Sequence, residues 1–485
     1  MGKVMPSKPN ILFLMTDQMQ GRVLEPGHPC QTPNFDSLAS RGVRFTRAYT
    51  PNAVCSPARA SLMTGLLPHN HGVLTVTHVV DDDQSVLRAD KPHWAQRLSE
   101  SGYRTAYFGK WHIERSFDLR RFGWQEGACE GSETLQLLER EASERRRSGQ
   151  FSLEWFLENP PGYSRHRFYG VTDVPPEQRP VGIRTSLAMD FLDEALTGSE
   201  PWCCFVSVIE PHDPFICGED AFALYDVQGI ELPPNVNDDL AGRPGIYRKA
   251  ARVWDGMTDR QKREAAACYY AQITEIDQQF GKLMDRIEQV GQLENTIVVL
   301  TSDHGELLGA HGLFCKNFTG AEEIYNVPMI LAGPGVSRGE VADARVGSHD
   351  LCPTLLELTN CAPIESPDSR SFASVLRDPI NEAKHFQTGY AEYFGGRMIL
   401  TQRVIWDGPW KLVFNGFDFD ELYNLEKDPY EMANLAENSD YKDKLREMTA
   451  QMWKKARDTG DRSLYNSDYP ILRVAPYGPF AAKDA

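Results

Sequence analysis

Short apolar runs alternate with segments of helical periodicity over most of the chain. The apolar runs occupy residues 10–16, 105–108, 203–209, 296–301 and 327–331. Between them, apolar residues recur at helical spacing, and we predict helices at residues 34–41, 60–64, 91–101, 185–196, 262–290 and 351–358. Buried strands that alternate with helices are typical of βαβ units. The pattern therefore predicts an α/β fold with a mixed, mostly parallel central sheet flanked by helices.

Two parts of the chain depart from this pattern. Residues 115–180 are rich in charge, aromatic side chains, Gly and Pro and lack a clear period. We interpret them either as an insertion over the loop end of the sheet that shapes a substrate pocket, or as a plain surface excursion. Beyond residue 385, short runs at 404–406, 410–414 and 421–425 predict a small antiparallel sheet, followed by a helix at 441–457.

These changes in character divide the chain into three parts. We predict a catalytic α/β domain at residues 1–384, a smaller C-terminal α+β subdomain at 385–461 and an extended arm at 462–485. An arm that lies on a neighbouring copy is compatible with a homo-oligomer, either a dimer or a tetramer.

Composition excludes several classes of partner. A net charge of -17 over 485 residues argues against nucleic acid, which requires clustered Lys and Arg. The first apolar run, residues 11–15, is too short for a signal peptide or a membrane span, and no later run is long enough to span a membrane. We therefore expect a cytoplasmic enzyme without membrane contact. The ten cysteines form no Cys-x-x-Cys pair, which indicates reduced, mostly buried thiols.

The most informative segment is Cys55-Ser56-Pro57-Ala58-Arg59. It places a thiol in a turn at a predicted helix start, with a guanidinium four residues further on. A helix N-terminus and a nearby guanidinium both stabilise an anion. For a single cysteine taken alone, a small buried thiol is the simpler interpretation.

Further polar residues follow the predicted strands. Asp17 and Asp303 end two of them, and His304 comes directly after Asp303. Open α/β sheets place their sites at the carboxyl ends of the strands, so we expect these side chains to converge. Two carboxylates and an imidazole can hold one divalent cation near Cys55. The amide oxygen of Gln18 can add a ligand.

The Cys55 segment resembles the Cys-x-Pro-x-Arg signature of the sulfatase family, within the alkaline phosphatase superfamily. Four more segments resemble family motifs in the same order: Leu14-Met15-Thr16-Asp17-Gln18, Gly109-Lys110-Trp111-His112, Pro211-His212-Asp213-Pro214 and Thr301-Ser302-Asp303-His304-Gly305-Glu306, with Gly312-Leu313-Phe314-Cys315-Lys316 just beyond. The resemblance implies an alkaline phosphatase-like fold and one divalent metal ion. It also implies that a formylglycine-generating enzyme oxidises Cys55 to formylglycine.

Two positions depart from the commonest sulfatase pattern. Gln18 stands where many members have a second Asp, and His304 where they have Asn. Both features resemble choline sulfatases and phosphonate monoester hydrolases. Losing a carboxylate and gaining an imidazole shifts the metal preference from Ca²⁺ toward Mn²⁺, and both ions stay candidates. The segment Lys110-Trp111-His112 favours a sulfatase, because the phosphonate hydrolases generally lack it.

The resemblance implies hydrolysis of a sulfate ester or sulfamate of a small anionic substrate, with release of inorganic sulfate. The hypothesis makes a hydroxyl of hydrated formylglycine at position 55 the nucleophile. A phosphonate monoester or phosphodiester hydrolase on the same site is one alternative, and a non-catalytic protein with unmodified Cys55 is another. The catalytic set beside Cys55 comprises Arg59 for activation, Lys110 and Lys316 for charge, His212 as the acid that protonates the leaving group and His112 as the base.

Overall fold

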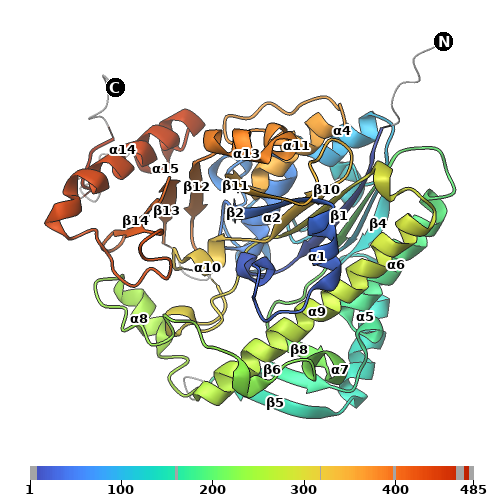
Figure 1. Ribbon diagram of the computed structural model, residues 1–485, viewed down its shortest axis with the longest axis horizontal. Helices are drawn as coiled ribbons and strands as arrows, with labels where there is room; N and C mark the ends of the chain where they lie inside the picture. The colour runs from blue at the N-terminus through green and yellow to red at the C-terminus, as the bar shows by residue number, and fades with distance from the viewer. Residues whose placement is uncertain (1–7, 159–161, 317, 397–399, 466–474, 480–485) are drawn as a thin grey trace.

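A computed structural model describes residues 8–158, 162–316, 318–396, 400–465 and 475–479. Its centre is an eight-stranded sheet (Figure 1). Only β10 runs antiparallel to its neighbours, and the other described pairs of this sheet are parallel. The predicted mixed, mostly parallel sheet is confirmed. In spatial order the strands are β11 (Glu340–Gly347), β2 (Gly42–Tyr49), β10 (Met329–Ala332), β9 (Thr296–Ser302), β1 (Asn10–Thr16), β7 (Trp202–Ser207), β3 (Arg104–Gly109) and β4 (Glu126–Cys129).

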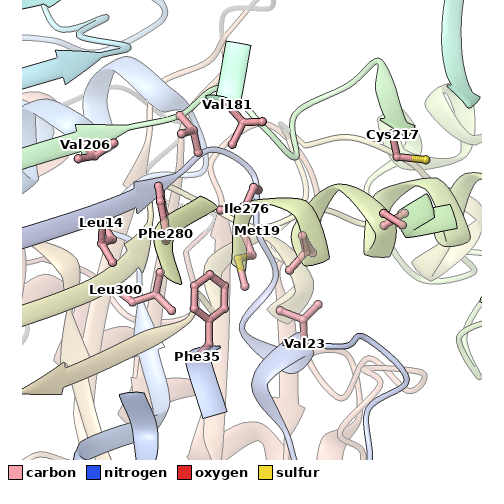
Figure 2. Packing of buried hydrophobic residues seen from close by; sticks show 14 of the residues in the cluster. Leu14, Met19, Val23, Phe35, Val181, Val206, Cys217, Ile276, Phe280 and Leu300 are labelled. Carbon is pink, nitrogen blue, oxygen red and sulfur yellow. The ribbon is translucent and has the colours of Figure 1, made fainter. Parts of the chain in front are cut away.

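Helices cover both faces of this sheet. One face packs against α1 (Pro33–Ser40), α6 (Pro180–Ala195) and the long α9 (Asp259–Gln289); the other packs against α2 (Cys55–Thr64), α4 (Trp94–Glu100) and α11 (Leu351–Leu358). Side chains of β1 alternate between these two cores. Leu14 meets Phe280 of α9 and its neighbours in the first core (Figure 2), and Phe13 lies in the second. Burial on both faces explains why β1 is an unbroken apolar run.

The strands and helices predicted from periodicity in the first part of the chain are confirmed, with shifted ends. The start of α6 moves from 185 to Pro180, and the start of α2 moves by as much, from Ala60 to Cys55. Pro57 lies in the first turn of the helix, where a missing N–H removes no intrahelical bond. Cys55 therefore lies at the helix N-terminus.

Several strands and helices were not predicted from the sequence. Strands β2 and β11 carry charged residues among their apolar ones and have partly exposed positions. Within residues 115–180, β4 joins the main sheet beside β3, so part of this segment belongs to the sheet. The rest of the segment contains α5 (Glu133–Ser148), in which half of the residues are charged. It also contains the strands β5 (Phe151–Leu157) and β6 (His166–Thr172), which form a three-stranded sheet with β8 (Phe215–Gly218).

The C-terminal part forms a separate antiparallel sheet with a helix packed on it. The predicted strands correspond to β13 (Gln402–Asp407), β14 (Trp410–Asn415) and β15 (Glu421–Asn424), and β12 (Thr388–Tyr393) adds an unpredicted edge. The predicted helix is α14 (Lys442–Thr459). Of the predicted arm, Arg462–Tyr465 form the short helix α15, whereas residues 466–474 and 480–485 lie outside the described residues. Other short helices are α3 (Pro68–His71), α7 (Glu219–Phe222), α8 (Gly245–Ala251), α10 (Glu322–Tyr325), α12 (Ala373–Arg377) and α13 (Pro379–Glu382).

All ten cysteines are free thiols, as their spacing predicts, and eight of them are buried. In the part of the chain that the structure describes, no helix combines the length and the apolar character needed to cross a bilayer.

Candidate active site

The carboxyl edge of the main sheet gathers the predicted residues. Asp17 follows β1, Asp303 follows the neighbouring β9, and Lys110 follows β3. Cys55 opens α2 at the same edge, because β2 runs parallel to β9 on the other side of β10. The fully buried Asp17, the 2% exposed Cys55 and the 1% exposed Asp303 show that the site lies below the surface.

Three side chains form a cation-binding arrangement. His304 Nε2 lies 3.7 Å from Asp17 Oδ1 and 3.6 Å from Asp303 Oδ1. His304 Nδ1 lies 2.9 Å from the Gly305 carbonyl oxygen, so it donates there and leaves the Nε2 lone pair toward the carboxylates. Asp17 Oδ1 is buried and has no hydrogen-bond partner among the described residues. With Cys55 Sγ, the ligand atoms of this group all lie within 4.8 Å of one another.

Arg59, one turn along α2 from Cys55, fixes both carboxylates. Its Nε donates to Asp303 Oδ2 at 2.8 Å and one terminal nitrogen donates to Asp17 Oδ2 at 3.1 Å. The other terminal nitrogen donates to the Lys110 carbonyl oxygen at 2.9 Å and to Ser207 Oγ at 2.8 Å. Because Arg59 binds the two Oδ2 atoms, both Oδ1 atoms face the His304 imidazole. Asp17 Oδ1 keeps its lone pairs for a cation, whereas Asp303 Oδ1 also accepts the backbone N–H groups of Gln18 and His304.

Two lysines concentrate positive charge on Cys55. Lys110 Nζ donates to Asp17 Oδ2 at 2.5 Å. Lys316 Nζ lies 3.3 Å from Cys55 Sγ, 2.9 Å from Gln18 Oε1 and 2.7 Å from His212 Nε2. Burial alone raises the pKa of the Cys55 thiol, but Lys110, Lys316 and His304 together hold that pKa well below its usual value. The site therefore stabilises an anion at position 55 and on a group bound above it.

The two predicted proton-transfer histidines both interact with the Cys55 side chain. Burial and the Lys110 charge lower the pKa of His112 to about 4, so its imidazole is neutral and can accept a proton. His112 has a φ of 57°, a conformation that few non-glycine residues adopt. His212 donates from Nδ1 to the Asp213 carbonyl oxygen at 2.7 Å and presents Nε2 to Lys316.

A family comparison decides the class of protein. The model of the sulfatase family matches residues 9–361, and a model described as the C-terminal part of N-sulphoglucosamine sulphohydrolase matches residues 309–458. The chain belongs to the sulfatase family. This sulfatase is a sulfuric ester hydrolase, and its fold is that of the alkaline phosphatase superfamily.

Individual relatives match over nearly the whole chain. The sulfatase is 32% identical over 470 residues to the uncharacterized sulfatase YidJ of Escherichia coli K12, covering 93% of this chain and 88% of that protein. It is 28% identical over 448 residues to the choline-sulfatase of Rhizobium meliloti, covering 89% and 83%. A phosphonate monoester hydrolase from Silicibacter pomeroyi shares the fold, with a TM-score of 0.77, 23% identity and coverage of 94% and 96%.

The sulfatase site also contains residues to which sequence reasoning assigned no role. Gln18 Nε2 donates to Glu306 Oε2 at 2.6 Å and to Asp213 Oδ1 at 3.1 Å, and these two acceptors turn the amide oxygen of Gln18 toward Lys316. Burial raises the pKa of Glu306 to about 7. Glu306 and Asp213 both lie within the segments that resemble family motifs, and that position is the signal from which a role could have been inferred. His78, which contacts His112, lies in no motif.

The structure thus brings together every residue predicted for the sulfatase site. The metal candidates and the cationic and nucleophilic candidates form one continuous contact network below the carboxyl edge of the sheet. Its members are Asp17, Gln18, Cys55, Arg59, Lys110, His112, His212, Asp303, His304 and Lys316.

Proposed function

We propose that this sulfatase releases inorganic sulfate from a sulfate ester or sulfamate by means of a formylglycine made from Cys55 and one divalent metal ion. The observation that carries this proposal is the convergence of cations on a buried residue at a helix N-terminus, directly beside two carboxylates and an imidazole. A small anionic substrate fits this charge distribution, although the chain as a whole is acidic.

The residues fit a divalent metal ion. Asp17 Oδ1, which has no hydrogen-bond partner among the described residues, would hold it together with Asp303 Oδ1 and His304 Nε2. Gln18, whose backbone N–H donates to Asp303 Oδ1, is a fourth ligand candidate through its amide oxygen. When bound, such an ion polarises a sulfuryl oxygen and favours ionisation of a hydroxyl. One imidazole among oxygen ligands favours Mn²⁺, whereas two carboxylates suit Ca²⁺ as well.

The protein side chains have separate tasks in this proposal. Formylglycine supplies, as a hydrate, one hydroxyl for attack and a second for release of sulfate. Lys110 and Lys316 neutralise the charge that develops on the sulfuryl oxygens. His212 gives a proton to the leaving oxygen, and the neutral His112 takes a proton from the second hydroxyl. Arg59 holds the geometry on which these steps depend.

The mass of the peptide that contains residue 55 tests the modification. Protein from a host that has the formylglycine-generating enzyme should carry an aldehyde at position 55, and sulfate release should scale with the modified fraction. Full activity in protein that carries only the thiol would contradict the proposal. A thiol without activity would instead favour a binding role. Chelation should abolish sulfate release, and adding back Ca²⁺ or Mn²⁺ separately identifies the working ion.

Gln18 and His304 are the observations that favour a second candidate function. Both lie at the metal-binding group, and both resemble the phosphonate monoester hydrolases. A phosphonate monoester or phosphodiester hydrolase would use the same site. Rates on an aryl sulfate and on a matching phenylphosphonate ester, measured with one preparation, separate the two, and we expect the sulfate to react faster. Lys110, which contacts Asp17, supports that expectation.

A further inference from the structure

His78 contacts the base candidate of the site, although it belongs to no sulfatase motif. Its Nδ1 lies 2.6 Å from His112 Nε2, and the two rings stack with centroids 4.7 Å apart and an interplanar angle of 27°. His78 is exposed, whereas His112 is largely buried. The pair therefore joins the interior of the site to its surface.

The segment that carries His78 is anchored on both sides of the pair. The Thr77 backbone N–H donates to Oγ of Ser56, the residue next to Cys55, at 3.3 Å. The Arg115 guanidinium, three residues after His112, donates to the carbonyl oxygens of Thr77, Val80 and Asp81. Because the chain neighbours of Cys55 and His112 hold this segment, its imidazole is placed relative to both of them.

The contact restricts where His112 can carry its proton. Two imidazole nitrogens 2.6 Å apart require that one donates and the other accepts. His112 Nδ1 is buried without a hydrogen-bond partner among the described residues. Because His78 occupies Nε2 of His112, Nδ1 of His112 is the nitrogen that can accept a proton from residue 55. To accept a proton there, His112 must carry its own proton on Nε2, and His78 Nδ1 must be the acceptor.

We propose that His78 is a positioning residue that accepts the His112 Nε2–H bond and so keeps His112 Nδ1 unprotonated toward residue 55. When Nδ1 takes up a proton, the resulting imidazolium still donates Nε2–H to His78, which stabilises it. A carboxylate that orients a catalytic histidine acts in the same way. This inference rests on the proposed role of His112 as the base.

The tautomer of His112 can be measured directly on the full chain. ¹⁵N NMR of histidine-labelled protein, with His112→Ala for assignment, should show a protonated Nε2 and an unprotonated Nδ1. In His78→Ala the proton should redistribute toward Nδ1. A protonated Nδ1 in the unsubstituted protein would overturn the proposal. This measurement needs no turnover, so it stays decisive even where the proposed function fails.

Kinetics provide the second test. His78→Ala should lower kcat about tenfold to a hundredfold, the effect of losing one hydrogen bond to a charged group, while KM stays within about twofold. His78→Gln keeps a side-chain acceptor and should recover part of this loss. The matched control is Val79→Ala, an exposed neighbour on the same segment, which should leave kcat unchanged. If His78→Ala and Val79→Ala have equal kcat values in an active, aldehyde-bearing enzyme, His78 has no such role, whereas the proposed function stands.

Discussion

Replacing Arg59 by lysine tests whether one guanidinium fixes both metal-site carboxylates. Arg59 makes four hydrogen bonds, to Asp303, Asp17, Ser207 and the Lys110 carbonyl oxygen, and it is 1% exposed. A lysine keeps the charge, but its single nitrogen cannot span both carboxylates.

The size of the effect follows from the bonds that are lost. At least one hydrogen bond to a carboxylate and one to a neutral acceptor are lost. Together these losses lower the free energy of unfolding by about 3 kcal/mol. Because both carboxylates then lose their orientation, kcat/KM should fall about a hundredfold, the equivalent of that energy. A lysine that found equivalent partners by a small shift of α2 would show neither loss.

Sulfate release from an aryl sulfate and urea unfolding measure the two quantities in Arg59→Lys. Arg260→Lys is the matched control, because Arg260 is 74% exposed and pairs with Glu264 on the surface, where such pairs contribute little. If Arg59→Lys kept kcat/KM within about threefold of the unsubstituted enzyme, the bridging role would be refuted.

Two further predictions concern buried acids and a distant histidine. Glu306→Ala removes the acceptor of Gln18 Nε2 and of two backbone N–H groups. We therefore expect kcat to fall about tenfold and the free energy of unfolding to fall by about 2 kcal/mol. An unchanged kcat would exclude a role for Glu306 in orienting Gln18. Burial lowers the pKa of His69, but its contact with Glu392 raises that pKa to about 9 overall. This group stabilises the fold below its unfolded pKa of 6.5, and the contribution is lost as the pH rises through 9. Relative to His69→Asn, the protein should therefore lose about 3 kcal/mol of unfolding free energy over that range, and parallel pH profiles of the two proteins would contradict the assignment.

Sequence reasoning located the parts of the site that depend on one chain segment. Asp17 and Asp303 could be predicted because each ends a strand buried on both faces, where apolar runs are long and unambiguous. The Cys55 helix began earlier than expected because its first turn contains Pro57, a position at which periodicity carries little information.

The parts that were missed depend on contacts between distant segments. The bond between Gln18 and Glu306 joins residues 288 positions apart, and no local pattern in either segment encodes it. His78 meets His112 only because Ser56 and Arg115 anchor its segment. In the same way, β2 and β11 were missed because both contain charged and partly exposed residues, and their places as the two outermost strands on one side of the sheet come from tertiary pairing.

The central claim, that residue 55 carries the chemistry through a group with two hydroxyls, is tested most directly by counting turnovers of Cys55→Ser. A serine provides one hydroxyl, so it could attack once but could not release sulfate by expelling it from the same carbon. With excess aryl sulfate, the unsubstituted enzyme should release many equivalents of sulfate, whereas Cys55→Ser should release the aryl alcohol at most once per chain and no free sulfate. Sustained release of free sulfate by Cys55→Ser would contradict the account.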